Sequence, residues 1–164
     1  MKVGVIGAGV MGRGIAQVSA MAGHSVVLFD INHETLEVAR NAIDKNLSKA
    51  IDLKKIDNQD KDSCQKLIQF SNSIADVKVD LVIEAIVENI DVKLSVFENL
   101  AEINKEDTIY ASNTSSIPLT QIAAGFKYPS QMVGIHFLNP ELLIKSSITS
   151  CEATFSSKTL SPST

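Results

Sequence analysis

The feature of this sequence that most constrains its fold is the hexapeptide GAGVMG, Gly7 to Gly12, which follows an apolar run and precedes a helix-forming stretch. A G-x-G-x-x-G pattern between a strand and a helix is typical of the turn that binds a dinucleotide pyrophosphate. In such a turn Gly7 permits the tight bend, Gly9 lets the backbone approach the anion, and Gly12 allows the helix to pack closely on the strand. The free N–H groups at the helix start then face the anion. The alternative is a glycine-rich turn with only a structural role.

Asp30 favours a dinucleotide-binding role for the glycine turn over a purely structural one. It ends the stretch SVVLFD, about 20 residues beyond the glycines, where a carboxylate can accept hydrogen bonds from both hydroxyls of a ribose. The same carboxylate would repel the 2′-phosphate of NADP, so the sequence predicts NAD as the cofactor. Taken alone, Asp30 would be a turn residue at a strand end, which is the weaker interpretation beside the glycines.

Hydrophobic patterning predicts strands and helices that alternate along the chain. Parallel strands need crossover connections, so this alternation predicts a Rossmann-type, doubly wound α/β fold with a mostly parallel sheet. Residues 52–66 read as a polar turn that leads into a short helix. Strands are expected at 3–6, 25–29, the run DLVIEAIV, TIYAS and a last one at 132–136, and helices at 11–22, at 33–50 after an Asn32 cap, near 64–68, at 91–101 and at 118–124.

Length and composition are those of one soluble domain. With 164 residues, 45% of them hydrophobic and 21% charged, the chain can bury one sizeable core. A net charge of −4 without a polybasic run gives no attraction to nucleic acid or to an anionic membrane. The first residues imitate a signal peptide, but the glycines and Arg13 interrupt that run, and no apolar segment reaches the roughly 20 residues of a membrane span.

The two cysteines, Cys64 and Cys151, lack C-x-x-C spacing and predict neither a disulfide framework nor a metal site. A reducing cytoplasm is therefore the expected location. Ser and Thr dominate the end of the chain, which has few apolar residues to hold it in place. We expect an NAD-binding domain over residues 1–145 and a weakly packed tail over residues 146–164.

Polar side chains follow the carboxyl ends of the predicted strands, where ligands bind in an open parallel sheet. His136 lies there, at the end of the apolar run MVGIH, where a histidine is more often a packing residue than a catalyst. Other polar residues share this edge with His136, and their presence favours a functional role for it. The polar residues concerned are Asp30, Glu84, Glu88, Ser112 to Ser116, and His136.

Four stretches make the chain similar to a known family: GVIGAGVMGRGIAQVSAMAGHSVVLFD, DLVIEAIVENIDVK, ASNTSSI and GIHFLNP. From Met1 to about Pro140 it resembles the NAD-dependent 3-hydroxyacyl-CoA dehydrogenases, which include the 3-hydroxybutyryl-CoA enzymes. The first stretch is partly generic to dinucleotide binding, whereas the other three are far more specific. The resemblance implies an oxidoreductase that transfers hydride between NAD and the C3 hydroxyl or keto carbon of an acyl-CoA.

The resemblance also implies roles for two catalytic residues. Ser115 would hydrogen-bond the 3-oxygen of the substrate, and His136 would remove the hydroxyl proton as hydride leaves for the nicotinamide. An imidazole suits this step because its ordinary pKa, about 6.5, lets it exchange protons near neutral pH. Taken alone, Ser115 would be a loop hydroxyl, since no G-x-S-x-G elbow surrounds it.

On the cofactor side the resemblance implies contacts from Glu88 and Lys93, and amides at the nicotinamide end from Asn113 and Asn139. Without the family, Lys93 reads as a solvated helix charge and Asn139 as a turn residue before a proline. Lys54 lies where the family touches coenzyme A, although the match there is loose.

The sequence departs from the family pattern after the Asn-Pro pair. Family members pair the histidine with a glutamate a dozen residues downstream, and counting without a gap gives Ile148. If several residues are missing after the Asn-Pro pair, Glu141 takes the role instead. The alternative for Glu141 is an ordinary exposed carboxylate, and the two interpretations remain open.

Length is the second departure. From the resemblance we expect a fragment, a truncated product or a divergent relative that lacks the family's C-terminal helical domain, which covers the acyl-CoA site and forms most of the dimer contact. The face that this domain would cover could favour self-association into a homo-oligomer. One alternative function is therefore a module that binds NAD without turnover. Another is a hydroxyacid dehydrogenase of a different family, but it would need a catalytic lysine in a helical second domain.

Overall fold

The computed structural model describes residues 1–137 and 152–155. Strands and helices alternate through most of this range, as the hydrophobic pattern predicts. In chain order the elements are β1 (Lys2–Ile6), α1 (Val10–Met21), β2 (Ser25–Phe29), α2 (His33–Asp52), α3 (Asn58–Leu67), β3 (Ile68–Ser71), η1 (Ile74–Asp76), β4 (Leu81–Glu84), α4 (Ile90–Ile103), β5 (Ile109–Ser112), α5 (Leu119–Gly125), η2 (Pro129–Gln131), β6 (Met132–His136) and β7 (Glu152–Phe155).

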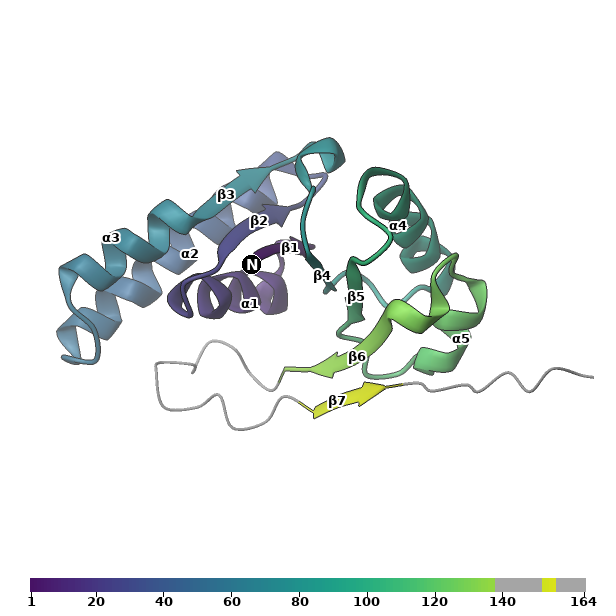
Figure 1. The fold of residues 1–164 in the computed structure, drawn as a ribbon. Helices are drawn as coiled ribbons and strands as arrows, with labels where there is room; N and C mark the ends of the chain where they lie inside the picture. Colours follow the sequence, from purple (N-terminus) through teal and green to yellow (C-terminus); the bar gives the residue numbers. More distant parts are fainter. Residues whose placement is uncertain (138–151, 156–164) are drawn as a thin grey trace, which may run out of the picture.

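The strands form one sheet in the order β3-β2-β1-β4-β5-β6-β7. The first six strands pair in parallel, and β7 pairs with β6 in antiparallel fashion (Figure 1). The order reverses between β1 and β4, because the chain first adds strands on one side of β1 and then on the other. This reversal defines a doubly wound fold and confirms the predicted Rossmann-type sheet.

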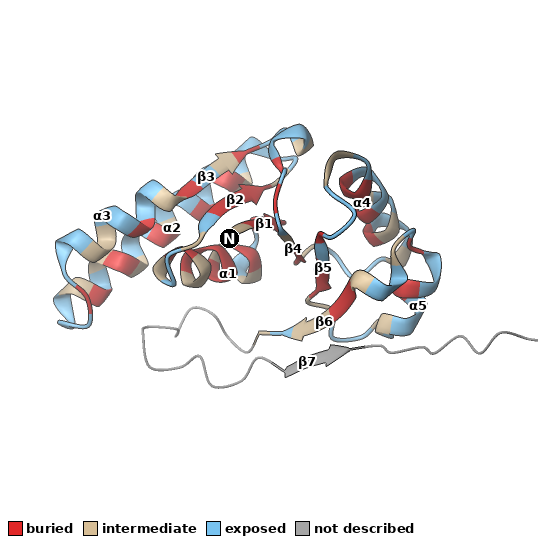
Figure 2. Cartoon of the chain, viewed as in Figure 1, coloured by how far each residue is buried: buried red, intermediate tan, exposed pale blue. Residues whose placement is uncertain are grey.

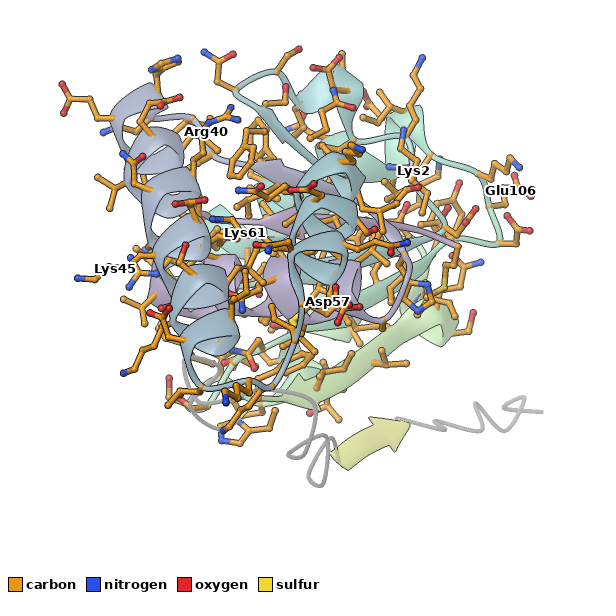
Figure 3. The ribbon with its side chains drawn as sticks, turned by 90° about the vertical axis from the view of Figure 1, so that its left-hand side faces the viewer. Lys2, Arg40, Lys45, Asp57, Lys61 and Glu106 are labelled. Carbon is orange, nitrogen blue, oxygen red and sulfur yellow. The ribbon has the colours of Figure 1, made fainter. Side chains whose placement is uncertain are left out.

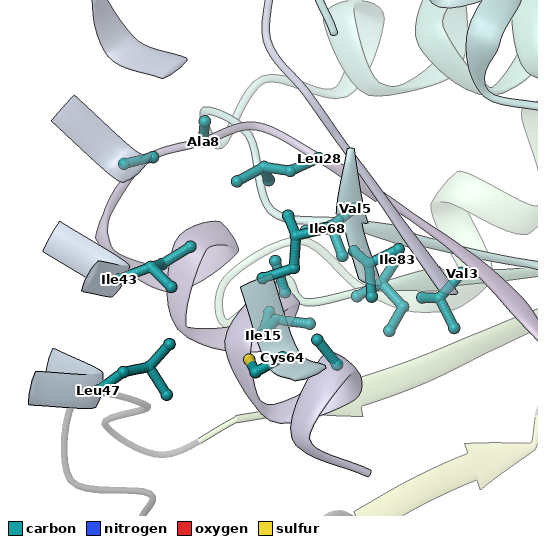
Figure 4. Close-up of a cluster of buried hydrophobic side chains, with 14 of the residues drawn as sticks. Val3, Val5, Ala8, Ile15, Leu28, Ile43, Leu47, Cys64, Ile68 and Ile83 are labelled. Atoms are coloured by element: carbon teal, nitrogen blue, oxygen red, sulfur yellow. The ribbon is translucent and has the colours of Figure 1, made fainter. Parts of the chain in front are cut away.

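Helices cover both faces of the sheet, and two apolar clusters fill the space between the layers (Figure 2). Neighbouring residues of a strand point to opposite faces, so Val26 and Leu28 belong to one cluster while Val27 and Phe29 belong to the other. Strands buried on both faces have to be apolar throughout, which explains the uninterrupted Val and Ile runs. Figure 4 shows the cluster under α1, α2 and α3, with Ile15, Leu47 and Cys64 facing Val5, Leu28 and Ile68.

The region expected as a polar turn with a short helix near 64–68 is different in the structure. Helix α3 spans Asn58–Leu67, and Ile68 already begins β3, a strand that was not predicted. A capping box starts the helix early, since Asp57 accepts a hydrogen bond from the Asp60 N–H and Asp60 accepts one from the Asp57 N–H. Apolar periodicity did not predict the start of this helix, because Cys64 is its one buried residue.

Helices α2 and α3 lie side by side as a hairpin, and Lys61 lies between them (Figure 3). Its Nζ atom is 2.6 Å from Asp44 Oδ1 and 2.8 Å from Ser48 Oγ. The hydrogen bond from Lys61 is the largest cause that lowers the pKa of the Asp44 carboxyl below its ordinary value. Lys61 thus joins the two helices through polar contacts.

The sheet continues past β6, the strand expected to be the last. Strand β7 lies inside the range 146–164 that was expected as a weakly packed tail, and its backbone pairs with β6. The boundary between a domain over 1–145 and a tail over 146–164 remains a prediction. Within the described ranges, no helix is long and apolar enough to cross a membrane, and no group of three or more His, Cys, Asp or Glu residues could hold a metal ion.

Candidate functional site

Five loops follow strands that end at the same edge of the sheet. Parallel pairing places Ile6 beside Phe29 on one side and beside Glu84 on the other. The pairing continues from Glu84 to Ser112 and from Ser112 to Gly134, two residues before the end of β6. The glycine turn, Asp30, the Glu88 loop, the Ser115 loop and His136 therefore share the carboxyl edge, as the sequence predicts.

The glycine turn adopts a backbone that needs glycine at two of its positions. Gly7 has a φ of +97°, a conformation that L side chains rarely adopt. A Cβ atom at Gly12 would overlap the carbonyl oxygen of Gly7, so the helix can approach the strand only without a side chain there. A Cβ atom at Gly9 would meet no heavy atom within 4 Å. The structure thus gives no packing reason for Gly9, which fits a backbone left bare for a ligand.

Asp30 connects the glycine turn to the end of β2. Its Oδ2 atom accepts a hydrogen bond from the Ala8 N–H at 2.9 Å, and its Oδ1 atom accepts one from the Asn32 N–H at 2.9 Å. A carboxylate has about four acceptor positions, so lone pairs remain for ribose hydroxyls. The residues present therefore fit NAD: a bare turn at a helix N-terminus for the pyrophosphate and a neighbouring carboxylate for the ribose.

A buried ion pair joins the end of β4 to the first turn of α4. Glu84 and Lys93 are 0% and 1% exposed, and Lys93 Nζ is 2.6 Å from Glu84 Oε1. Lys93 is therefore not the solvated helix charge suggested by the sequence without the family. Removing one partner of a buried pair leaves an uncompensated charge and costs about 3–5 kcal/mol.

Glu88 connects this ion pair to the Ser115 loop. Its Oε2 atom is 3.5 Å from Lys93 Nζ and accepts a hydrogen bond from the Thr114 hydroxyl at 2.8 Å, while Oε1 accepts one from the Ser115 N–H at 3.0 Å. Partial desolvation raises the pKa of Glu88, but the hydrogen bonds from Ser115 and Thr114 and the charge of Lys93 outweigh it and lower the pKa below its ordinary value. The Ser115 residue itself is exposed.

His136 lies at the exposed end of β6, next to Asn113 of the β5 loop. The Asn113 side-chain oxygen accepts a hydrogen bond from the Phe137 N–H at 3.0 Å, and the Asn113 N–H donates to the Glu84 carbonyl at 2.9 Å. Asn113 therefore fixes the chain directly after His136, a structural task that the sequence did not reveal. Its amide nitrogen is the end of the side chain that remains for a ligand.

Asn139 and Glu141 lie outside the described residues. Lys54 lies in the turn after α2, roughly 30 Å from the carboxyl edge, since 20 helical residues at 1.5 Å each separate it from the start of that helix. The structure therefore does not bring Lys54 to the site at the sheet edge.

The sequence also failed to assign a role to Glu84 and Ser112, whose side chains are buried under the edge. Ser112 Oγ donates to Glu84 Oε2 at 2.6 Å. One signal could have indicated Glu84: a carboxylate inside the apolar run DLVIEAIV requires a partner when its strand is buried on both faces.

Comparison with known proteins identifies relatives of the chain. Residues 2–148 match the family model described as 3-hydroxyacyl-CoA dehydrogenase, NAD binding domain. A probable 3-hydroxybutyryl-CoA dehydrogenase of Deinococcus radiodurans is 43% identical over 146 residues, which are 88% of this chain and 52% of that protein.

Two solved structures show the same likeness in three dimensions. The crystal structure of Mycobacterium tuberculosis FadB2 has a TM-score of 0.81 and 41% identity, covering 84% of this chain and 49% of that one. The 3-hydroxybutyryl-CoA dehydrogenase of Escherichia coli has a TM-score of 0.83 and 39% identity, covering 86% of this chain and 30% of that one. The chain spans about half the length of most of the curated relatives it matches.

Proposed function

The chain belongs to the 3-hydroxyacyl-CoA dehydrogenase family, where it corresponds to the NAD-binding domain, and from this premise we propose that it takes part in hydride transfer between NAD and the C3 carbon of an acyl-CoA. The observation that carries the proposal is the common edge of the sheet. There the glycine turn and Asp30, which suit the cofactor, lie in one row with Ser115 and His136, which suit the substrate.

Each described residue has a task in this reaction. The bound cofactor supplies the hydride acceptor. The backbone after Gly9 and the carboxylate of Asp30 hold the pyrophosphate and the adenosine ribose. Asn113 and Glu88 face the nicotinamide end, and Lys93 acts there through Glu88, because its own ammonium is buried.

The two catalytic groups act on the substrate oxygen. The exposed Ser115 hydroxyl donates a hydrogen bond to the 3-oxygen, and the His136 imidazole accepts the hydroxyl proton as the carbonyl forms. The proton must leave as hydride departs, so loss of either group slows the chemical step more than cofactor binding. Asn139 is proposed as a further amide at the nicotinamide end.

A carboxylate beside His136 would stabilise the imidazolium that forms. Glu141 remains one candidate for this role. Replacing Glu141 by glutamine tests this role, because loss of the true partner should lower the rate and change its pH dependence.

The test follows the absorbance of NADH as acetoacetyl-CoA is added to the chain. We expect oxidation of NADH that falls by at least about a hundredfold in His136→Asn, because the imidazolium gives the proton to the 3-oxygen in this direction and general acid–base catalysis contributes about 10² to 10⁴ in rate. His24→Asn, a histidine outside the five loops at the carboxyl edge, is the matched control and should leave the rate unchanged. A rate that survives His136→Asn would refute the catalytic assignment.

Binding of NADH without any turnover would favour the alternative, a module that holds the cofactor only. In that case the groups needed for turnover would lie in the half of the relatives' length that this chain does not span. The proposal also includes an acyl-CoA partner, self-association and a cytoplasmic location. Light scattering tests self-association.

A further inference from the structure

We propose that Glu84 is a positioning residue that holds the Ser115 loop in its working place before any ligand arrives. The inference rests on the proposed function, because only that function gives Ser115 a substrate to contact. Glu84 ends β4 at the point where the strand order reverses, between the strand before the glycine turn and the strand before the Ser115 loop. Ligands of doubly wound folds bind beyond this point.

The Glu84 carboxylate accepts hydrogen bonds from donors in three parts of the chain. Its Oε1 atom accepts from the Ile86 N–H at 2.8 Å and from Lys93 Nζ at 2.6 Å, and its Oε2 atom accepts from the Ser112 hydroxyl at 2.6 Å. These donors belong to the loop after β4, to α4 and to the end of β5. One fully buried carboxylate thus links the segments that lie beneath the site.

The contacts continue from the buried Glu84 carboxylate to the surface. Lys93 lies between Glu84 and Glu88, and Glu88 accepts hydrogen bonds from the Thr114 hydroxyl and the Ser115 N–H. Each step joins a charged group to its neighbour, and such charge-assisted contacts are short and directional. The Ser115 backbone is therefore held by a series of contacts that begins at Glu84, a buried residue that does not touch the ligand.

The electrostatics explain why a carboxylate is needed at this position. Lys93 carries its charge into the interior, where an ammonium is costly unless it is paired. With Glu84 neutral, Lys93 would have to draw Glu88 inward to find a partner. Glu88 could not then also accept from Ser115 and Thr114, so the loop would lose its attachment.

Amide hydrogen exchange of the ligand-free chain tests this inference in Glu84→Gln, which keeps the size of the side chain. We expect the Ser115 amide to exchange at least about tenfold faster, the factor for losing one hydrogen bond to a charged group. Amides in the centre of β1 and β4 exchange through global unfolding and report the stability lost with the buried pair, whereas the Ser115 amide should accelerate through local opening of its loop. Glu98→Gln, an exposed carboxylate on the same helix as Lys93, is the matched control and should change neither.

A second variant keeps the inference testable if Glu84→Gln does not fold. Glu84→Gln with Lys93→Met removes both buried charges together, which proteins often tolerate. With no ammonium left to draw Glu88 inward, the Ser115 amide should exchange near its wild-type rate in this double variant. Wild-type exchange at Ser115 in folded Glu84→Gln, or fast exchange in the double variant, would overturn the role of Glu84.

Titration of the wild-type chain with NADH separates this inference from the proposed function. If NADH does not bind, the proposed function fails, while the exchange result at Ser115 still decides whether Glu84 holds the loop. If NADH binds and Ser115 exchanges normally in Glu84→Gln, only the positioning role fails.

Discussion

At Gly9 a Cβ atom would meet nothing within 4 Å, whereas at Gly12 it would overlap the Gly7 carbonyl oxygen. The sequence pattern gave these residues separate tasks, and the structure supports the distinction. Gly12 is needed for folding because helix and strand touch there. At Gly9 the chain itself leaves the side-chain position open, and we propose that the ligand is the reason for a glycine there.

The first prediction compares alanine at these two glycines. Gly12→Ala should lower the free energy of unfolding by about 1–3 kcal/mol, as overpacking does, while Gly9→Ala should change it by less than about 0.5 kcal/mol. Gly9→Ala should nevertheless weaken NADH binding, because the methyl group occupies the approach of the pyrophosphate. Thermal unfolding and calorimetric titration measure the two effects. Unchanged NADH affinity in Gly9→Ala would contradict the assignment of this turn.

Tyr110 provides a second prediction at this scale. Its ring is fully buried and packs edge-on against Phe126, with ring centroids 4.8 Å apart. Its hydroxyl has no hydrogen-bond partner among the described residues, and desolvation is the main cause that raises the pKa of Tyr110 to about 12. Tyr110→Phe should therefore raise the free energy of unfolding, by up to about 1 kcal/mol, because it removes an unsatisfied group. Denaturant unfolding that shows a clear loss of stability would reveal a partner for the hydroxyl.

The third prediction concerns pH and Glu88. Its folded-state pKa lies below its ordinary value, so its contacts stabilise the fold fully above the unfolded pKa of about 4.3 and are lost as the pH falls through the folded value. Exchange at the Ser115 amide, after correction for intrinsic rates, should therefore accelerate only in that acid range. Glu88→Gln should remove this pH dependence. A transition above the ordinary pKa would mean that desolvation outweighs the hydrogen bonds.

At the scale of elements, apolar patterning predicts well where one face of an element is buried. The strands over 25–29 and 132–136 have the predicted bounds, because their Val and Ile residues lie in the core. Helix α3 was predicted too short and strand β3 was not predicted, because their sequence carries few apolar residues. Capping by Asp57 and pairing with β2 decide their structure instead. Contacts between distant residues, such as Glu84 with Lys93 and Ser112, require a fold before they can be recognised.

The turn between α2 and α3 gives a fourth prediction. Lys54 is the one described non-glycine residue with a positive φ, 53°, and its N–H donates to the Ile51 carbonyl at 2.8 Å to close the helix. Glycine adopts this conformation without strain, so Lys54→Gly should raise the free energy of unfolding by about 0.5–1 kcal/mol. Lys55→Gly is the control and should give no gain, because Lys55 has no positive φ. Thermal unfolding of both variants decides between strain relief and a general effect of glycine.

At the scale of the whole molecule, the order of the strands determines which residues meet. Reversal between β1 and β4 brings the glycine turn, Glu88 and Ser115 to neighbouring positions, although about a hundred residues of sequence separate the first from the last. The common edge was predictable from the alternation of elements. The pairing of β7 with β6 was not, because the Ser- and Thr-rich sequence around it has no clear strand pattern.

The most direct measurement records backbone amide chemical shifts of the chain while NADH is added, with NADPH as the comparison. We predict saturable shifts at Gly7 to Gly12, around Asp30 and in the Ser115 loop, and weaker binding of NADPH because Asp30 repels its 2′-phosphate. Shifts confined to the opposite edge, near Gly23 and Lys105, or no saturable shift at all, would contradict a nicotinamide nucleotide site at the carboxyl edge of this sheet.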